Sequence, residues 1–123
     1  MKYSLDITEE EMAYAKEVLK PTGYRILVAV AKTSDKIGSV LIPDQRKSDE
    51  DVASVLGKVI ELGPDAYSDS ERFPNGPYCA PRDVVFMASY SGRRFKINDR
   101  EYRLINDDTV MAVAMKPEEI ERA

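Results

Sequence analysis

The first regular pattern in the chain is helical and covers residues 8 to 20. Thr8 is a preferred helix N-cap, and Glu11 stands three residues later, as in a capping box. Pro21 then ends the periodic segment. The apolar positions that share one helical face are Met12, Ala15 and Leu19. The pattern therefore predicts an amphipathic helix that docks on another part of the molecule.

From residue 24 the period changes, and residues 24–31 alternate as in a β-strand with apolar side chains on both faces. A strand of this composition is usually covered on both sides. Shorter strand patterns follow at 55–62, 83–88, 95–97, 102–105 and 109–115. The pair Asn98-Asp99 predicts a hairpin turn between two of them. Short strands at this spacing predict an all-β fold, a small partly open β-barrel to which the N-terminal helix is added.

A long polar segment, residues 32–53, interrupts the strands. Loops of more than about 12–15 residues are usually functional or disordered. The segment encloses one apolar island and its small or turn-forming neighbours: Val40, Leu41 and Ile42, flanked by Gly38, Ser39 and Pro43. From composition alone, the island is either a short buried strand or an exposed binding element.

The length of 123 residues suits one domain. We expect an N-terminal helical extension at 1–20, a barrel domain at 21–117 and a C-terminal tail at 118–123. Within the barrel domain, residues 64–82 are rich in Pro, Gly, Ser, Asp and Asn. They predict a second long loop, with a tight turn at Asn75-Gly76.

The composition limits the kinds of catalytic and metal sites that the chain can form. The chain has no histidine and one cysteine, Cys79, which excludes Cys/His zinc sites, Ser–His and Cys–His catalytic pairs and disulfides within the chain. The formal net charge of −4 does not favour nucleic acid as a partner. No apolar run approaches the ~20 residues of a membrane span. We expect no enzyme activity, no cofactor, no metal and no membrane contact, and the lone cysteine without a signal-like N-terminus indicates the cytoplasm.

Seven short segments along the chain carry motifs whose order can be compared with that of known families: Lys20–Val28, Gly38–Pro43, Gly57–Gly63, Arg82–Phe86, Tyr90–Gly92, Tyr102–Ile105 and Asp108–Val113. The first has a proline followed by an arginine and an apolar strand, and the second has small residues before an apolar tripeptide. In this order they resemble the GroES-type co-chaperonin family over roughly residues 20 to 116.

The resemblance implies a lid that caps an ATP-driven chaperonin ring of the GroEL type and closes a chamber in which client polypeptides fold. The nucleotide would belong to the partner. The lid would be a homo-oligomer, a heptameric ring, in which the first strand of one subunit pairs with the last strand of its neighbour. Residues 32–53 would be the mobile loop that binds the chaperonin, and residues 64–82 the roof loop.

The same resemblance implies roles for individual residues. Those expected to bind the chaperonin are Val40, Leu41 and Ile42, with Gly38, Ser39 and Pro43 as the loop hinge. Those expected at the subunit interface are Ile26, Val28, Val30, Val110, Met111 and Val113. Tyr90 either packs within its turn or lines the chamber and contacts the client.

Three features depart from the family pattern. The helix at 8–20 is extra, Ser39 replaces the second loop glycine, and Arg82 stands where glycine is usual. These departures suit a divergent, virus-encoded member. Two alternatives remain open: a small-barrel nucleic-acid-binding protein, which the negative charge and the absence of tryptophan disfavour, and a virion structural or assembly protein.

Overall fold

The computed structural model describes residues 3–33, 54–88 and 90–121 of the chain. One α-helix, α1 (Glu9–Val18), precedes the main strands. The strands are β1 (Tyr3–Ser4), β2 (Arg25–Val30), β3 (Lys32–Thr33), β4 (Ser54–Leu62), β5 (Val84–Ala88), β6 (Arg93–Ile97), β7 (Arg100–Asn106) and β8 (Ala112–Val113). Two 3-10 turns follow, η2 (Asp107–Thr109) after β7 and η3 (Pro117–Glu119) after β8. The described part of the chain is therefore mostly β with one α-helix, as the sequence predicts.

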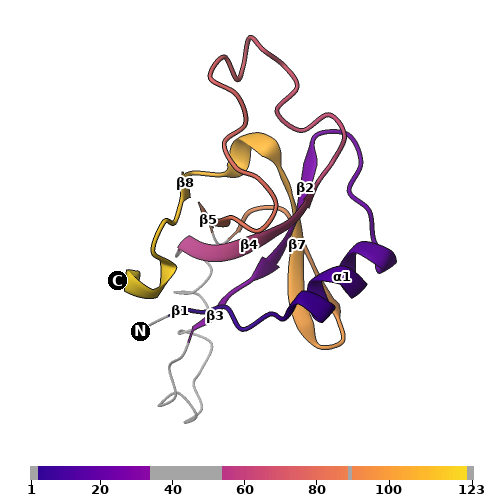
Figure 1. Ribbon diagram of the computed structural model, residues 1–123, viewed down its shortest axis with the longest axis vertical. Helices are drawn as coiled ribbons and strands as arrows, with labels where there is room; N and C mark the ends of the chain where they lie inside the picture. Colours follow the sequence, from indigo (N-terminus) through magenta and orange to yellow (C-terminus); the bar gives the residue numbers. More distant parts are fainter. Residues whose placement is uncertain (1–2, 34–53, 89, 122–123) are drawn as a thin grey trace.

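Six strands form one antiparallel sheet in the order β6-β7-β2-β4-β5-β8 (Figure 1). The sheet is open between its edge strands β6 and β8, which is the partly open barrel expected from the sequence. β2 lies in the middle, hydrogen-bonded to β4 on one side and to β7 on the other. A register shift between Leu27 and Val28 marks a bulge in its pairing with β4, which bends the strand. β1 and β3 form a separate two-stranded sheet that the sequence did not predict.

The apolar character of both faces of β2 is explained by a layer on each side. Ile26, Val28 and Val30 point into the barrel core, where Val59, Val85, Met87 and Ile105 from the other strands join them. Leu27 and Ala29 point the other way, into a smaller cluster closed by α1. The prediction that this strand is covered on both faces is confirmed.

Helix α1 supplies the second layer, and local sequence signals begin it. The Thr8 hydroxyl accepts a hydrogen bond from the Glu11 amide (3.0 Å), and the Glu11 carboxylate accepts one from the Thr8 amide (3.1 Å), which completes the capping box. Met12 and Ala15 on its inner face are buried. Figure 1 shows the helix lying beside β2 and β7, away from β8.

The β6–β7 hairpin turns at the two residues that the sequence indicated. Asn98 and Asp99 have φ values of 49° and 68°, as a two-residue hairpin turn of the primed type requires. The chain enters β6 through Gly92 (φ 72°), where a Cβ atom would clash with the Leu104 carbonyl oxygen. Glycine at this position therefore permits the close approach of the turn to β7.

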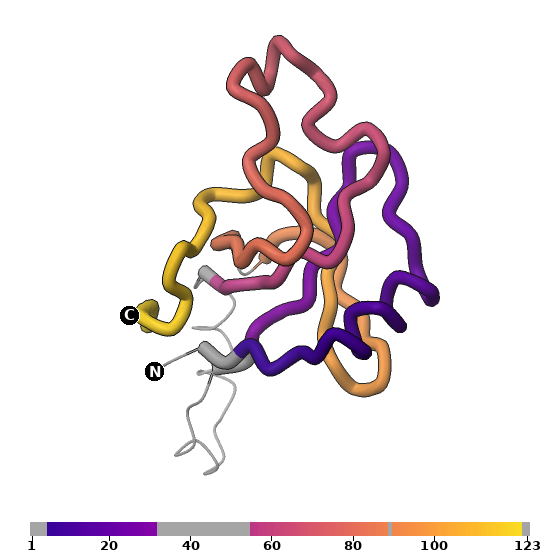
Figure 2. The backbone as a smooth tube through the Cα atoms, viewed as in Figure 1, coloured from indigo at the N-terminus to yellow at the C-terminus, as the bar shows by residue number. Residues whose placement is uncertain are grey.

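The connection from β4 to β5, residues 63–83, rises away from the barrel (Figure 2). Its base is an aromatic cluster: the Tyr67 and Phe73 rings lie 4.9 Å apart, and both contact the Tyr78 ring. The tight turn predicted at Asn75-Gly76 is present, since the Gly76 amide donates to the Phe73 carbonyl (3.0 Å). Tyr67, Phe73 and Cys79 belong to the barrel core, so this loop closes one end of it.

Two expectations about the strands need correction. The first main strand does not offer an open edge, because β2 is already paired on both sides. The last strand is shorter than residues 109–115: η2 takes up its beginning, and only Ala112 and Val113 pair with β5.

Candidate functional site

The residues expected to bind a chaperonin lie outside the described residues: Val40, Leu41 and Ile42, with the hinge residues Gly38, Ser39 and Pro43. The structure does describe where that segment joins the sheet. The Ala31 amide donates to the Leu56 carbonyl (2.8 Å), close to both ends of the undescribed stretch. Tyr3 and Ser4 also pair with Thr33 and Lys32, at its beginning. The segment therefore leaves and re-enters the sheet at neighbouring positions.

The two edges of the sheet differ in chemistry. On β6 the exposed side chains are Arg93, Arg94 and Lys96, and charged residues on an edge strand oppose pairing with another chain. The β8 edge is apolar: Met111 is 56% exposed and Met115 is 85% exposed. Of the two edges, only β8 has the character of an edge that pairs with another strand.

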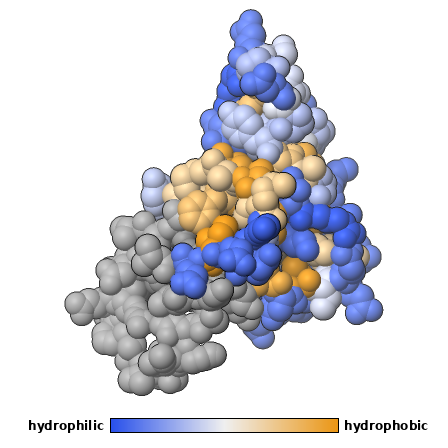
Figure 3. Space-filling view, turned by 60° about the vertical axis from the view of Figure 1, so that its left-hand side comes forward, coloured by the Kyte–Doolittle hydropathy of each residue, from blue (hydrophilic) through white to orange (hydrophobic). Residues whose placement is uncertain are grey.

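A hollow of about 460 Å³ lies beside β8. It is lined by Tyr78, Asp108, Val110, Met111, Ala112 and Val113. Figure 3 turns the β8 side of the molecule forward and shows apolar residues gathered below the hydrophilic tip of the projecting loop. Exposed apolar surface at a strand edge is typical of a protein–protein contact.

The interface residues expected from the sequence are not all available to a neighbour. Ile26, Val28 and Val30 are buried in the barrel core of their own chain, so their placement at an interface is wrong. Val110 is buried in the same core, and Val113 packs against it. Met111 is the expected interface residue that the structure leaves exposed.

Tyr90 is 79% exposed, so the alternative that it packs within its turn is wrong. The turn itself is tied to the sheet. The Ser91 amide donates to the Ala88 carbonyl (3.0 Å), and the buried Arg103 donates through Nη1 to the Ser91 carbonyl (3.2 Å). The Tyr90 ring is thus presented to solvent from an anchored turn.

Acidic residues of the 63–83 loop order the loop itself. The Asp69 carboxylate accepts hydrogen bonds from the amides of Glu71 (3.0 Å) and Arg72 (3.4 Å). Arg72 in turn donates to Asp108 (2.7 Å) beyond β7. Asp107, 1% exposed, accepts from the Tyr67 amide (3.0 Å) and so fixes the base of the loop. These contacts make the loop a structured element.

Burial controls the titration of two groups under that loop. Burial raises the pKa of the Cys79 thiol, although its contact with the Tyr67 hydroxyl (3.5 Å) partly offsets this effect. Burial also raises the pKa of Tyr67. Both groups stay protonated at neutral pH, so the thiol is not a ready nucleophile.

A feature that sequence reasoning missed is the set of ion pairs that fastens the N-terminal segment to the barrel. Arg82 makes a two-pronged ion pair with Glu9. Arg100, 8% exposed, donates to Glu11 (3.0 Å) and to Asp6 (2.9 Å). The departure at Arg82 was visible in the sequence, but its partner is 73 residues away and only the fold brings them together.

The described part of the chain contains no group of three or more Cys, Asp or Glu side chains placed to hold a metal ion. Among the helices in that part, none is long and apolar enough to cross a membrane.

The sheet order and the added helix define a small GroES-like β-barrel. The model of the chaperonin 10 kDa subunit family matches residues 18–114, which is most of the chain. The chain therefore belongs to the chaperonin 10 kDa subunit family. Its general role is that of a co-chaperonin, and membership implies partnership with a GroEL-type chaperonin. The helix α1 lies almost entirely before the matched region.

Proposed function

We propose that a heptameric ring of this chain caps a GroEL-type chaperonin and closes a chamber in which client polypeptides fold. The observation that carries the proposal is the family match over residues 18–114. The protein would bind no nucleotide and catalyse no reaction, because the ATP belongs to the chaperonin. The single, buried cysteine suits a reducing compartment, and we place this activity in the cytoplasm.

Ring assembly would use the apolar β8 edge. A contact between this edge and a different surface of the next copy is heterologous, and such contacts close into a ring when the rotation fits. Met111 would be the main apolar contact, since it is exposed at that edge. The charged β6 edge would stay free.

Docking on the chaperonin would use Val40, Leu41 and Ile42. Burial of three such side chains contributes roughly 5–9 kcal/mol before any cost. Ordering about six residues costs roughly 6–12 kcal/mol, so one segment alone binds poorly. Tethering on a ring makes each further docking event intramolecular, and the combined avidity is then sufficient and still reversible.

The exposed Tyr90 would contact the client within the chamber. Tyr90 is 79% exposed, and Arg103 anchors its turn, so its ring can contact apolar segments of a client without a change of its own backbone.

The test is co-elution of the full chain with a GroEL-type ring, with and without ATP. The wild type should co-elute with the ring and itself have the mass of an oligomer by light scattering. Leu41→Asp should keep the oligomer mass and lose co-elution. Met111→Asp should reduce the mass toward that of one chain. A charge-matched control, Ile37→Asp, lies outside the tripeptide and should retain co-elution.

Each half of the proposal can fail separately. A wild type that has the mass of one chain at micromolar concentration would contradict the ring. Retained co-elution of Leu41→Asp would contradict docking through the tripeptide. A gel shift with nucleic acid at low salt would instead favour the rival barrel function, and co-purification with capsids rather than a chaperonin would favour a virion protein.

A further inference from the structure

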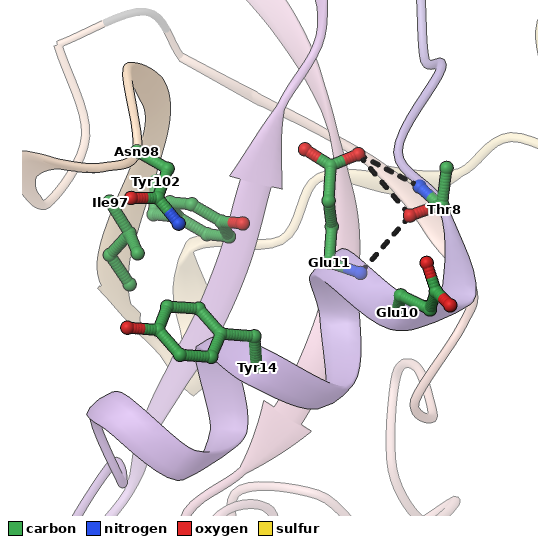
Figure 4. Close-up of a pocket in the computed structure, with 7 residues that line it drawn as sticks. All are labelled: Thr8, Glu10, Glu11, Tyr14, Ile97, Asn98 and Tyr102. Atoms are coloured by element: carbon green, nitrogen blue, oxygen red, sulfur yellow. Dashed lines mark hydrogen bonds between the residues drawn. The ribbon is translucent and has the colours of Figure 1, made fainter.

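A groove of about 190 Å³ lies between the first turns of α1 and the β6–β7 turn. Its lining residues are Thr8, Glu10, Glu11, Tyr14, Ile97, Asn98 and Tyr102. In Figure 4 the Tyr14 side chain projects from the helix toward the hairpin turn, and the Tyr102 hydroxyl points from the hairpin toward Glu11. The groove is smaller than the roughly 300–1,000 Å³ of sites for whole small molecules, so it suits a single side chain.

The Tyr102 hydroxyl is the first sign of a ligand. Tyr102 is 2% exposed, and its ring stacks on Phe95 with the centroids 6.0 Å apart. Its hydroxyl lines the groove, yet it makes no hydrogen bond with any other described residue. The ring is buried, but its unpartnered hydroxyl opens into the groove, so it can form a hydrogen bond with a polar group that enters from outside.

The charge of the groove is the second sign. Glu11 is held by Thr8 and Arg100, and the hydrogen bond from Arg100 lowers the pKa of its carboxyl, which keeps it ionised. Glu10 makes no hydrogen bond or ion pair with another described residue. The hydrogen bonds of Arg100 go to Asp6 and Glu11 and not to Glu10. The Glu10 carboxylate is therefore available to a cation that enters the groove.

Two aromatic rings in the groove add a feature that favours a cationic ligand. Tyr14 is 48% exposed at the rim, and Tyr102 forms part of the wall. Aromatic faces attract ammonium and guanidinium groups. Carboxylate oxygens and a tyrosine oxygen accept hydrogen bonds from the N–H groups of these cations. An anionic ligand would be repelled by Glu10 and Glu11.

We propose that this groove binds a lysine or arginine side chain from a basic segment of a partner protein. The aliphatic stem of that side chain would lie along Ile97 and Tyr14, and its charged end would meet Glu10 and the Tyr102 hydroxyl. Four of the seven lining residues lie within residues 8–14, which precede the family match at residue 18. The site therefore does not depend on the co-chaperonin function.

The experiment is saturation-transfer NMR on the full chain, which remains usable for weak binding to an oligomer. The probe is the peptide acetyl-Ala-Leu-Lys-Leu-Ala-amide, and its comparator carries norleucine in place of lysine. The lysine peptide should bind saturably and more weakly as salt is added, because the contact is partly ionic. The norleucine peptide should show at least tenfold weaker binding.

Two variants locate the site. Tyr102→Phe removes only the unpartnered hydroxyl and Glu10→Gln only a charge, and each should weaken the lysine peptide by roughly tenfold. Neither should lower the unfolding midpoint, since neither group has a partner among the described residues. The matched controls are Tyr24→Phe and Glu17→Gln, which make the same changes on exposed residues outside the groove and should bind as the wild type does.

The proposal is overturned if the wild type does not bind the lysine peptide, or if the norleucine peptide binds as well. It is also overturned if both groove variants bind as the wild type does. Loss of chaperonin co-elution in Leu41→Asp has no bearing on this result, so the two proposals fail independently.

Discussion

The two faces of the central strand meet very different layers. The barrel side is a cluster of Ile26, Val28, Val30, Val59, Tyr67, Phe73, Cys79, Val85, Met87, Ile105 and Val110. The helix side is a cluster of Ile7, Met12, Ala15, Leu27, Ala29, Ile60 and Tyr102. The first is drawn wholly from the region that matches the family, whereas the second takes Ile7, Met12 and Ala15 from before it.

The difference shows how an added segment becomes part of a fold. The barrel side closes on itself through strands and a loop. The helix side needs one helix, and ion pairs from Arg82 and Arg100 fasten that helix at its beginning. The extension is thus a covering layer of the sheet, held by a smaller apolar contact and by charges.

The largest effect is expected in the barrel core. Ile26→Ala removes a side chain that is fully buried between strands, and its neighbours cannot move in to fill the space. The free energy of unfolding should fall by about 2–5 kcal/mol in urea titrations at fixed protein concentration. A loss below about 1 kcal/mol would mean that this layer is not the dominant core.

Met12→Ala should have a smaller effect, about 2 kcal/mol, because the helix can shift toward the sheet and reduce the cavity. The same titration measures it. Val18→Ala is the control on the same helix: this valine is 51% exposed and lies away from the β8 edge, so the change should alter stability by less than about 0.5 kcal/mol. Equal losses of unfolding free energy for Met12→Ala and Ile26→Ala would show that the two layers contribute equally to stability, contrary to this expectation.

Acid should act on the helix side. The Arg100 hydrogen bond lowers the pKa of Glu11 in the folded chain below its ordinary value of 4.5. Its contribution to stability is therefore present above about pH 4.5 and is lost as the pH falls through the folded-state pKa. Glu11→Gln should have a lower urea midpoint than the wild type at pH 7, and this difference should shrink below pH 4.5.

A matched control for that experiment is Glu17→Gln, an exposed change on the same helix. Its urea midpoint should follow the wild type at both pH values. If the difference for Glu11→Gln were the same at pH 7 and pH 3.5, the carboxylate would not be the group that fastens the helix.

The smallest effect is expected for Arg82→Gly. Arg82 has a φ of 81°, a conformation that glycine adopts without strain, so the substitution relieves the backbone while it removes the ion pair with Glu9. The two effects oppose each other. Salt screens the ion pair and leaves the backbone term unchanged, so the melting temperature of Arg82→Gly should rise relative to the wild type as salt is added. A difference that is independent of salt would show that the ion pair contributes nothing.

Local signals were sufficient for much of the fold. The capping box at Thr8 and Glu11, the alternation along β2 and the hairpin turn at Asn98-Asp99 each depend on residues close in sequence, and each is present in the structure. The collinear motifs likewise indicated the family that the match over residues 18–114 shows. The interface assignment failed at Ile26, Val28 and Val30, because a strand at the edge of a sheet and a strand in its centre can have the same apolar sequence pattern.

The sequence by itself determined the helix with its amphipathic character, most of the main strands and the family, since periodicity and capping act over a few residues. It did not predict the β1–β3 pair or the short length of β8. Only the tertiary structure decided which strands have open edges, and that Arg82 and Arg100 fasten the N-terminal segment. It also decided that Tyr14 and Tyr102 share one groove with Glu10. These depend on strand order and on contacts between residues far apart in the chain, which no local pattern encodes.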